Sequence, residues 1–379
     1  IGSGIIGASC AYFLARNGMR VHVLEAQSTV CAGTSRACDG LVLVWDKPLD
    51  ATFKFAQFSA NLWRELADEL PIPFDYAQPG CLVIAESNEA FEQAKMLSQR
   101  MHQLGEACQM VEGQDLRAFA PHLSHDVRGA IYLPSEAQVE PRKATVALLR
   151  GAMEYGAHIS IDAPALDFQL RNSRIVAVRT PRGNLSCSAV VIAAGVWTPI
   201  LLTKLGMPSL PLRPRKGHVL VLERTYNIAP CPMLEVSYTS AVQSCNSNST
   251  DDDGAQIAFV LEPTVEQTVL LGSSRQFVGM NMDVDLRIAQ AIASRAVRFV
   301  PTLSSQLLLR IYVGLRPWTP DGMPIISPFD DVDGIYIATG HEGSGICMAP
   351  ATGWLIAKMM QGDELPDYAK AFTINRFIN

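Results

Sequence analysis

The chain has 379 residues, a net charge of -6, 48% hydrophobic residues and 18% charged residues, which is typical of a globular enzyme. Its longest basic run is Arg213-Pro214-Arg215-Lys216, so neither nucleic acid nor a strongly anionic surface is an expected partner. The nine cysteines are an odd number without a C-x-x-C pair, which indicates reduced thiols and excludes a disulfide framework or a cysteine-based metal site.

The first residues carry the most informative motif. Gly2, Gly4 and Gly7 form a G-x-G-x-x-G pattern, followed by apolar residues at helical spacing and by a short apolar run that ends at Glu25. Glycines permit a tight turn and the close approach of a pyrophosphate, which the N–H groups of the helix start can bind. An acid about 20 residues further on can accept hydrogen bonds from a ribose. This order predicts a nucleotide-binding βαβ unit, with a chance glycine turn as the alternative.

The motif normally follows a full apolar strand, whereas here only Ile1 precedes Gly2. We therefore expect the natural chain to begin upstream of this numbering.

A segment from Cys31 to Val42 is dense in small and hydroxyl residues. Such residues cannot build a core, but they can wrap closely around a ligand. Two interpretations remain open: a ligand-binding loop, or an ordinary loop that leads into a strand.

Further along the chain, apolar residues at helical spacing predict helices at 53–70, 88–104, 142–155 and 285–299, with Asn88 as a cap. The apolar run 189–198 predicts a strand buried on both faces of a parallel sheet, and its Ala193-Ala194-Gly195 end can pass close to a nucleotide. A plain buried strand and turn is the alternative. Residues 213–223, 257–261 and 268–274 predict an antiparallel region.

Residues 310–326 predict a strand, a proline-fixed turn and a second strand, and residues 335–340 predict another strand. A glycine-rich turn, His341 to Ile346, then opens a helix. Free N–H groups at a helix start form an electropositive pocket, so the chain is predicted to have a second such pocket near its C-terminus.

Taken in order, these motifs resemble the D-amino acid oxidase-like FAD-dependent oxidoreductases over nearly the whole chain. The resemblance implies an α/β fold: a Rossmann-like FAD-binding domain of discontinuous segments, 1–48, 136–207 and 310–379, plus an antiparallel-sheet (α+β) substrate domain, 49–135 and 208–309. Within the family, residues 212–218, 259–264 and 272–278 look most like beta subunits of heteromeric dehydrogenases for D-hydroxyproline, opines or proline.

The resemblance also implies which residues bind the cofactor: Gly2, Gly4, Ile5, Ile6, Gly7, Glu25, Ala26, Thr34, Ser35, Gly40, Leu41, Ala194, Gly195, Trp197, Gly314, Arg316, Gly343, Ser344, Gly345 and Ile346. Some family members tether FAD through a cysteine where this chain has Gly314, and others tether FMN through a histidine where it has Lys143. FAD is therefore expected to be non-covalent. FMN at a subunit interface is a second expectation, with Arg142, Lys143, Lys216 or His218 as phosphate partners.

For catalysis, the resemblance implies hydride transfer from carbon to flavin N5. Arg316 matches the arginine that holds the substrate carboxylate, because a planar guanidinium pairs bidentately with a carboxylate; a structural arginine is the alternative. Glycine-oxidising members have a second arginine where this chain has Gly343. Glu342 either pairs with the substrate ammonium or caps the helix, and His341 either contacts the flavin carbonyl edge or is a packed histidine.

The implied function is the oxidation of the C–N bond of a small amino or imino acid, with electrons passed to an alpha subunit and a small ferredoxin-like subunit. The alternatives are a self-contained glycine- or sarcosine-type oxidase that makes hydrogen peroxide, the glycine-oxidising subunit of hydrogen cyanide synthase, or a subunit that binds FAD for structure only. A cytoplasmic location is expected, with a peripheral electron acceptor at the inner face of the membrane as a variant. No metal site is expected.

Overall fold

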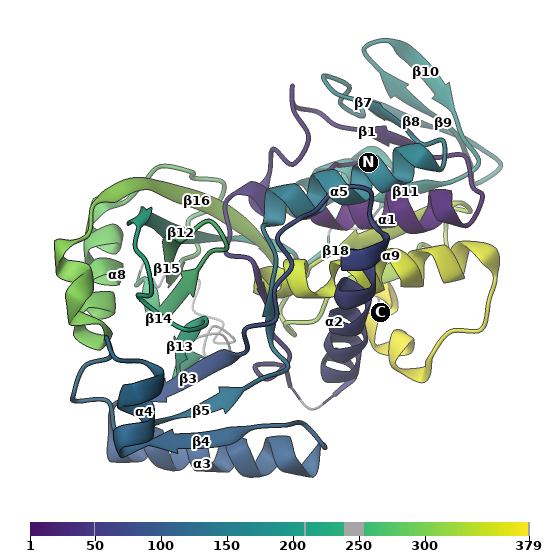
Figure 1. Cartoon of the computed structure of the whole chain (residues 1–379). Helices are drawn as coiled ribbons and strands as arrows, with labels where there is room; N and C mark the ends of the chain where they lie inside the picture. Colours follow the sequence, from purple (N-terminus) through teal and green to yellow (C-terminus); the bar gives the residue numbers. More distant parts are fainter. Residues whose placement is uncertain (49, 208–209, 239–253, 378–379) are drawn as a thin grey trace.

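A computed structural model describes residues 1–48, 50–207, 210–238 and 254–377. Figure 1 shows two regions side by side: a large sheet with α8 and α3 on its outer side, and a group of helices around α1 with short strands. This is the mixed α/β architecture that the sequence predicts. Within the described residues, no helix is both long enough and apolar enough to cross a membrane.

The helical region is built on short parallel strand pairs. Its strands are β1 (His22–Leu24), β7 (His158–Ser160), β11 (Val190–Ile192), β17 (Ile325–Pro328) and β18 (Ile335–Thr339). β1 pairs with β7 and β11 with β18, both in parallel, while β17 joins β18 antiparallel. The Gly2 N–H donates to Leu24 O at 2.8 Å, and the Ala193 N–H donates to Ile1 O at 2.9 Å. The glycine turn therefore starts between β1 and β11.

Helices pack around these strands: α1 (Ile5–Arg16), α2 (Ala51–Glu69), α5 (Pro141–Glu154), α6 (Thr198–Lys204) and α9 (Gly345–Gln361). A three-stranded antiparallel sheet lies at the periphery: β8 (Asp167–Arg171), β9 (Arg174–Thr180) and β10 (Gly183–Ser186). β2 (Leu41–Val42) pairs with β6 (Ala137–Gln138). Short 3₁₀ turns complete this region: η1 (Thr34–Arg36), η2 (Gly195–Trp197), η5 (Glu342–Ser344), η6 (Asp367–Phe372) and η7 (Ile374–Phe377).

The large sheet has eight strands in the order β16-β12-β15-β14-β13-β3-β5-β4. Their bounds are β16 (Leu308–Trp318), β12 (Arg213–Arg224), β15 (Thr268–Arg275), β14 (Gln256–Pro263), β13 (Met233–Glu235), β3 (Cys81–Ala85), β5 (Gly129–Leu133) and β4 (Gln109–Glu112). All neighbours are antiparallel except β13 and β3. β16 crosses the predicted domain boundary at residue 310, and the division into domains stays a prediction.

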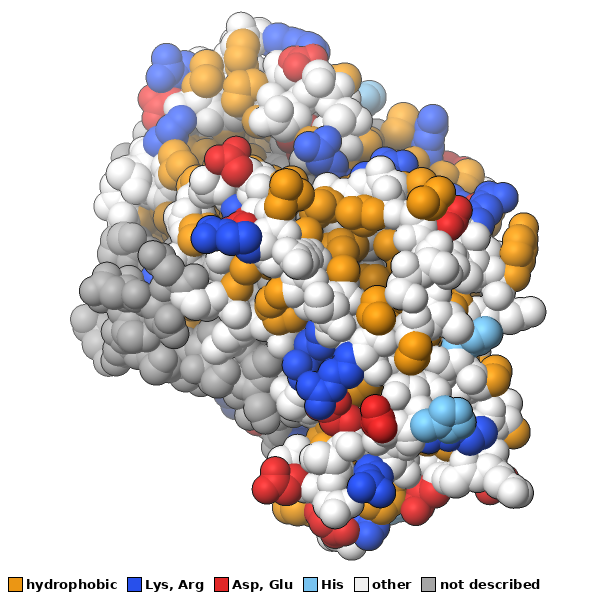
Figure 2. Space-filling view, turned by 90° about the vertical axis from the view of Figure 1, so that its left-hand side faces the viewer, with side chains coloured by type: hydrophobic (Ala, Val, Ile, Leu, Met, Phe, Trp, Pro, Cys, Tyr) orange, Lys and Arg blue, Asp and Glu red, His pale blue; other side chains and the backbone are white. Residues whose placement is uncertain are grey.

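The helices of the sheet region are α3 (Asn88–Gln103), α4 (Gly113–Phe119) and α8 (Leu286–Phe299), with the turn η4 (Pro301–Ser305) after α8. α3 begins at Asn88, as the sequence predicts, but its N-cap is Ser87 rather than Asn88, and the Ser87 hydroxyl accepts a hydrogen bond from the Ala90 N–H. Either side chain can cap a helix, so local sequence could not choose between them. Figure 2 shows hydrophobic side chains across the middle of the face that carries α8.

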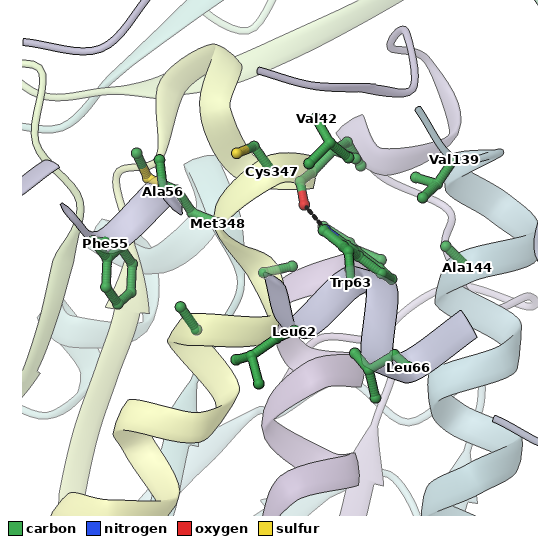
Figure 3. Close-up of a cluster of buried hydrophobic side chains, with 14 of the residues drawn as sticks. Val42, Phe55, Ala56, Leu62, Trp63, Leu66, Val139, Ala144, Cys347 and Met348 are labelled. Atoms are coloured by element: carbon green, nitrogen blue, oxygen red, sulfur yellow. Dashed lines mark hydrogen bonds between the residues drawn. The ribbon is translucent and has the colours of Figure 1, made fainter. Parts of the chain in front are cut away.

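The largest core cluster joins α2 to α9 and to the strands of the helical region. Trp63 of α2 is fully buried, and its indole N–H donates to Ile346 O at the start of α9, at 2.9 Å. Figure 3 shows Trp63 surrounded by Leu62, Leu66, Val42, Val139 and Cys347. The contact fixes the start of α9.

Trp63→Ala is therefore expected to lower the free energy of unfolding by about 3–5 kcal/mol, because it leaves a large void and an unpaired carbonyl. Trp63→Phe should cost less, about 1–2 kcal/mol, since most of the apolar volume remains. Chemical denaturation of both variants measures this. Leu307→Ala is the control: Leu307 is 64% exposed and its loss should change stability by less than about 0.5 kcal/mol.

Candidate active site

One continuous cavity of about 730 Å³ runs from the glycine turn to strand β16 of the large sheet. Its size lies within the range of small-molecule and cofactor sites. At one end it is lined by Gly2, Ser3, Gly4 and Glu25, and at the other by Arg316, Glu342 and Asp39. The cavity thus connects the predicted nucleotide motif with the predicted substrate arginine.

The glycine turn is shaped by close backbone contacts. Gly2 has φ +98°, a conformation that favours glycine, and a Cβ there would lie 2.5 Å from Ala193 O. A Cβ at Gly7 would collide with Gly2 O and lie 2.9 Å from Gly2 C. Gly7 therefore stands behind the turn and lets α1 approach it closely. This is the packing that the glycines of a dinucleotide motif provide.

Glu25 directly follows β1, and hydrogen bonds from two residues hold its side chain in place. Its carboxylate accepts hydrogen bonds from the Ser3 N–H at 3.0 Å, from the Ser3 hydroxyl, and from the Gln27 N–H at 2.9 Å. Ser35 of η1 lies opposite, and its hydroxyl accepts from the Ile5 N–H at 3.0 Å. The loop predicted either to bind a ligand or merely to connect elements therefore reaches the N-terminus of α1.

The cavity wall also includes charged residues of the large sheet. Arg316 on β16 is half-buried, and its guanidinium donates to Ser274 O at 2.9 Å. It lies over Gly217 of β12, where a Cβ would come within 2.7 Å of the guanidinium carbon. Gly343 lies against the same side chain, since a Cβ there would be 3.9 Å from Arg316 Nε. Gly217 thus leaves room for the arginine, whereas a Cβ at Gly343 would only make an ordinary van der Waals contact with it.

A buried ion pair stands beside it. Arg215 is the cross-strand partner of Arg316 and is fully buried, and its guanidinium is 3.1 Å from the carboxylate of Glu342. Burial raises the pKa of Glu342, but Arg215, Arg316 and Arg275 outweigh it and hold the pKa below its usual range. Glu342 is therefore ionised and already neutralised by a cation. The predicted pairing of Glu342 with the substrate and its alternative as a helix cap both remain predictions.

Arg275 on β15 is the third guanidinium. It is 2% exposed, donates to the Ser273 hydroxyl at 3.1 Å, and lies 4.8 Å from the centre of the Tyr238 ring. Tyr238 itself lines the cavity. Burial raises the pKa of Tyr238, so this phenol stays neutral.

His341 is buried, and its Nε2 lies 2.9 Å from the Thr352 hydroxyl. That hydroxyl donates its proton to Met348 O, so His341 Nε2 carries the hydrogen and Nδ1 is an acceptor. Burial lowers the pKa of His341 to about 3, which keeps the ring neutral. The predicted contact with a flavin carbonyl edge stays a prediction, and in this tautomer Nδ1 offers no hydrogen to it.

Most predicted site residues meet at this cavity. Those on its wall are Gly2, Gly4, Ile5, Ile6, Glu25, Ala26, Thr34, Ser35, Ala194, Gly195, Trp197, Gly314, Arg316, His341, Glu342, Gly343, Gly345 and Ile346. Four others lie just behind it: Gly7, Gly40, Leu41 and Ser344. Gly40 donates its N–H to Glu262 at 2.8 Å, and Leu41 is buried in β2.

Several residues of the site carried no predicted role: Asp39, Arg215, Gly217, Tyr238, Arg275, Met280 and Met282. Alternation along β12 could have placed Arg213, Arg215 and Gly217 on one face. Nothing local marks Arg275 or Asp39. Of the residues expected to bind FMN phosphate, Lys216 and His218 are buried, and they contact Asn281 and Ser274.

Glu262 supplies a pH-dependent element next to the site. Burial and nearby Asp39 raise its pKa to about 8, although the hydrogen bond from the Gly40 N–H opposes the shift. Burial likewise raises the pKa of Glu136 to about 8. Both carboxyls are therefore expected to be protonated in the folded protein at neutral pH.

Because the folded protein binds these protons more tightly than the unfolded chain, their contribution to stability is greatest below the unfolded pKa of 4.5 and is lost as pH rises through about 8. Thermal unfolding should therefore show a midpoint that falls as pH rises from about 4.5 to about 8 and levels off above that. Glu262→Gln, which stays neutral, should remove part of that fall. An equal fall in the variant would contradict the assignment.

The glycine turn, the helix start and the acid are the parts of a dinucleotide-binding motif, and they open onto the same cavity as Arg316. The family model described as FAD dependent oxidoreductase matches residues 1–359, and the chain belongs to this family. In the residues that the structure describes, no group of three His, Cys, Asp or Glu side chains is arranged to hold a metal ion.

Two curated relatives match over almost the whole chain. Glycine oxidase of Bacillus subtilis is 27% identical over 383 residues, which cover 99% of this chain and 96% of that protein. Hydrogen cyanide synthase subunit HcnC of Pseudomonas protegens is 25% identical over 416 residues, which cover 99% of this chain and 95% of that protein.

Solved structures share the fold. Glycine oxidase from Geobacillus kaustophilus superposes with a TM-score of 0.87 at 23% identity, covering 100% of this chain and 98% of that one. L-proline dehydrogenase from P. horikoshii superposes with a TM-score of 0.86 at 22% identity, covering 99% and 96%.

The cavity fits the family's cofactor. A Cβ at Gly2 would lie 2.5 Å from Ala193 O, so the turn has room for glycine but not for a side chain, and the first residues of α1 line the cavity. FAD needs such a cradle for its pyrophosphate.

Proposed function

We propose that this chain is an FAD-dependent dehydrogenase for a small amino or imino acid, of the D-hydroxyproline, opine or proline type, and that it oxidises the C–N bond and passes the electrons to partner subunits. The observation that carries the proposal is Arg316: a half-buried guanidinium on the wall of a cavity that begins at a dinucleotide motif. A guanidinium in such a position binds a carboxylate bidentately.

The residues that would hold FAD, non-covalently, divide by chemistry. Gly2, Gly4 and the first N–H groups of α1 would face the pyrophosphate, and Glu25 the ribose. Gly343 and Gly345, at the start of α9, would present N–H groups and a helix dipole to the flavin end. When bound, FAD supplies the hydride acceptor.

The protein's own part is to bind and orient the substrate. Arg316 would hold the carboxylate, and the Ser274 carbonyl with the flat surface of Gly217 fixes the direction of the guanidinium. Holding the α-carbon in one orientation lowers the entropic cost of reaching the reactive geometry. This effect can supply a large part of an enzyme's rate acceleration. Because Arg215 is paired with Glu342, Glu342 is already neutralised and Arg316 stays available to the substrate carboxylate.

The identity of the electron acceptor follows from subfamily resemblance, and the relatives point both ways. Glycine oxidase is named as an oxidase, whereas HcnC is named as a subunit and L-proline dehydrogenase as a dehydrogenase. We propose a heteromeric dehydrogenase with an alpha subunit and a small ferredoxin-like subunit. FMN at the interface is retained as a prediction for Arg142 and Lys143, whose side chains are 53% and 42% exposed.

The test is turnover by the purified, FAD-loaded chain with D-hydroxyproline, octopine, proline, glycine and sarcosine, in air or with an electron-accepting dye under argon. A dehydrogenase forms the carbonyl or imine product with the dye and little hydrogen peroxide in air. Peroxide formed in air at the rate seen with the dye would instead establish a self-contained oxidase.

A further inference from the structure

Asp39 is an acid on the wall of the cavity, close to Arg316. It lies between η1 and β2 and is half-buried. Within the described residues, no guanidinium or ammonium nitrogen lies within 4.0 Å of its carboxylate oxygens, the distance limit for an ion pair. Arg316 and Arg275 are nevertheless near enough to favour its charged form. An anion and a cation, Asp39 and Arg316, thus line one cavity without touching.

Glu342, the other acid on this wall, differs. Its carboxylate is 3.1 Å from the fully buried Arg215 and also accepts a hydrogen bond from the Gly343 N–H. A carboxylate held in this way by a cation is a weak proton acceptor. Once Arg215 and Glu342 neutralise each other, Arg316 and Asp39 remain as opposite charges on this part of the cavity wall.

Opposite charges on one cavity wall suit a zwitterion. An α-amino or imino acid carries a carboxylate and an ammonium on the same carbon, and a site with separated opposite charges can pair with both ends. A ligand that has a carboxylate but no ammonium could pair with Arg316, but it would leave Asp39 without a partner.

We propose that Asp39 is the catalytic acid–base group of the site: it pairs with the substrate ammonium and removes one of its protons before oxidation. An N–H bond of the substrate breaks, an O–H bond on Asp39 forms, and no electron leaves the substrate in this step. The freed lone pair on nitrogen makes the hydrogen on the neighbouring carbon a better hydride donor. This inference rests on the proposed function.

The surroundings of Asp39 agree with that role. It faces Arg316 from β16, Arg275 from β15, Glu262 from β14, Tyr238 and the neighbouring Cys38. Burial raises the pKa of Asp39 above its usual value, while Arg316 and Arg275 oppose the shift. A carboxylate that binds protons more readily than an exposed one, yet is not buried away from solvent, can both take a proton and release it.

The test compares two inert probes of one shape, 2-aminoisobutyrate and 2-hydroxyisobutyrate, which differ in the ammonium alone and have no α-hydrogen to lose. Dissociation constants come from the change in flavin absorbance of the FAD-loaded protein. We expect the wild type to prefer the amino probe by roughly tenfold or more. Asp39→Asn should abolish that preference and leave the hydroxy probe within about threefold of wild type. Glu342→Gln should keep the preference.

The proposal is overturned if the wild type shows no preference or binds neither probe, if Asp39→Asn keeps the preference, or if Glu342→Gln loses it. It is also overturned if Asp39→Asn alters the flavin spectrum or FAD affinity without ligand, because the carboxylate would then face the cofactor. The probes are not oxidised, so a preference that depends on Asp39 can be seen even if no amino acid is turned over. That outcome would refute the proposed function and retain Asp39 as an ammonium site.

Discussion

Arg316→Met is expected to lower kcat/KM for the amino acid substrate by roughly 10²- to 10⁴-fold, with FAD content unchanged. The substitution keeps much of the side-chain volume over Gly217 but removes the charge-assisted pairing with the substrate carboxylate. Arg316→Lys should recover only part of the loss, since an ammonium is a point charge that cannot pair in the same planar way. Steady-state kinetics with the best substrate of the panel measures the effect.

The matched control is Arg310→Met, on the same strand but exposed to solvent. It removes the same charge and should leave kcat/KM within about twofold, because screened surface charges contribute little. If Arg316→Met behaved like Arg310→Met, Arg316 would be a structural residue. The reading of this chain as a subunit that binds FAD without performing chemistry would then be favoured.

Gly7→Ala is the second change with a large expected effect. A Cβ at Gly7 would collide with the Gly2 carbonyl, a backbone atom of the turn itself. Relief requires α1 to move away from the turn, which should cost about 1–3 kcal/mol of unfolding free energy and weaken FAD binding at least about tenfold. Flavin content after gel filtration and chemical denaturation of the FAD-free protein measure the two effects separately.

Gly4→Ala is the comparison within the same turn. A Cβ there would meet only the Ser35 hydroxyl, at 3.2 Å, and that side chain can rotate. The FAD-free Gly4→Ala protein should therefore unfold within about 0.5 kcal/mol of wild type. Equal stability of the Gly7→Ala and Gly4→Ala proteins would show that the turn tolerates a side chain at Gly7.

The fold could be predicted largely because its signals are local. Helix periodicity placed α2, α3, α5 and α8 to within a few residues, and the glycine motif placed α1. The strands were harder. The apolar run 189–198 contains only three strand residues, 190–192, because Gly195 starts a 3₁₀ turn and α6 follows. Apolar composition reports burial, which a strand and a following helix share.

The site divides in the same way. Arg316 and the glycine motif belong to short recognisable segments, and the structure brings both to one cavity. The Arg215–Glu342 pair joins residues 127 positions apart, and it depends on the register of β12 against β16. The neighbours of Asp39 and Arg275 come from three different strands and a loop. Tertiary packing brings such residues together, so their spacing in the sequence does not predict the contacts.

The central claim is that this chain binds FAD and removes a hydride from an amino or imino acid held by Arg316. Its most direct test is anaerobic reduction of the FAD-loaded protein, followed at the visible flavin band, by D-hydroxyproline, octopine, proline, glycine and sarcosine in turn. We expect one of them to bleach the band of the wild type, with slow recovery in air, and to leave Arg316→Met oxidised while dithionite reduces both. If dithionite reduces the wild type but none of the five compounds does, the isolated chain does not perform the proposed chemistry.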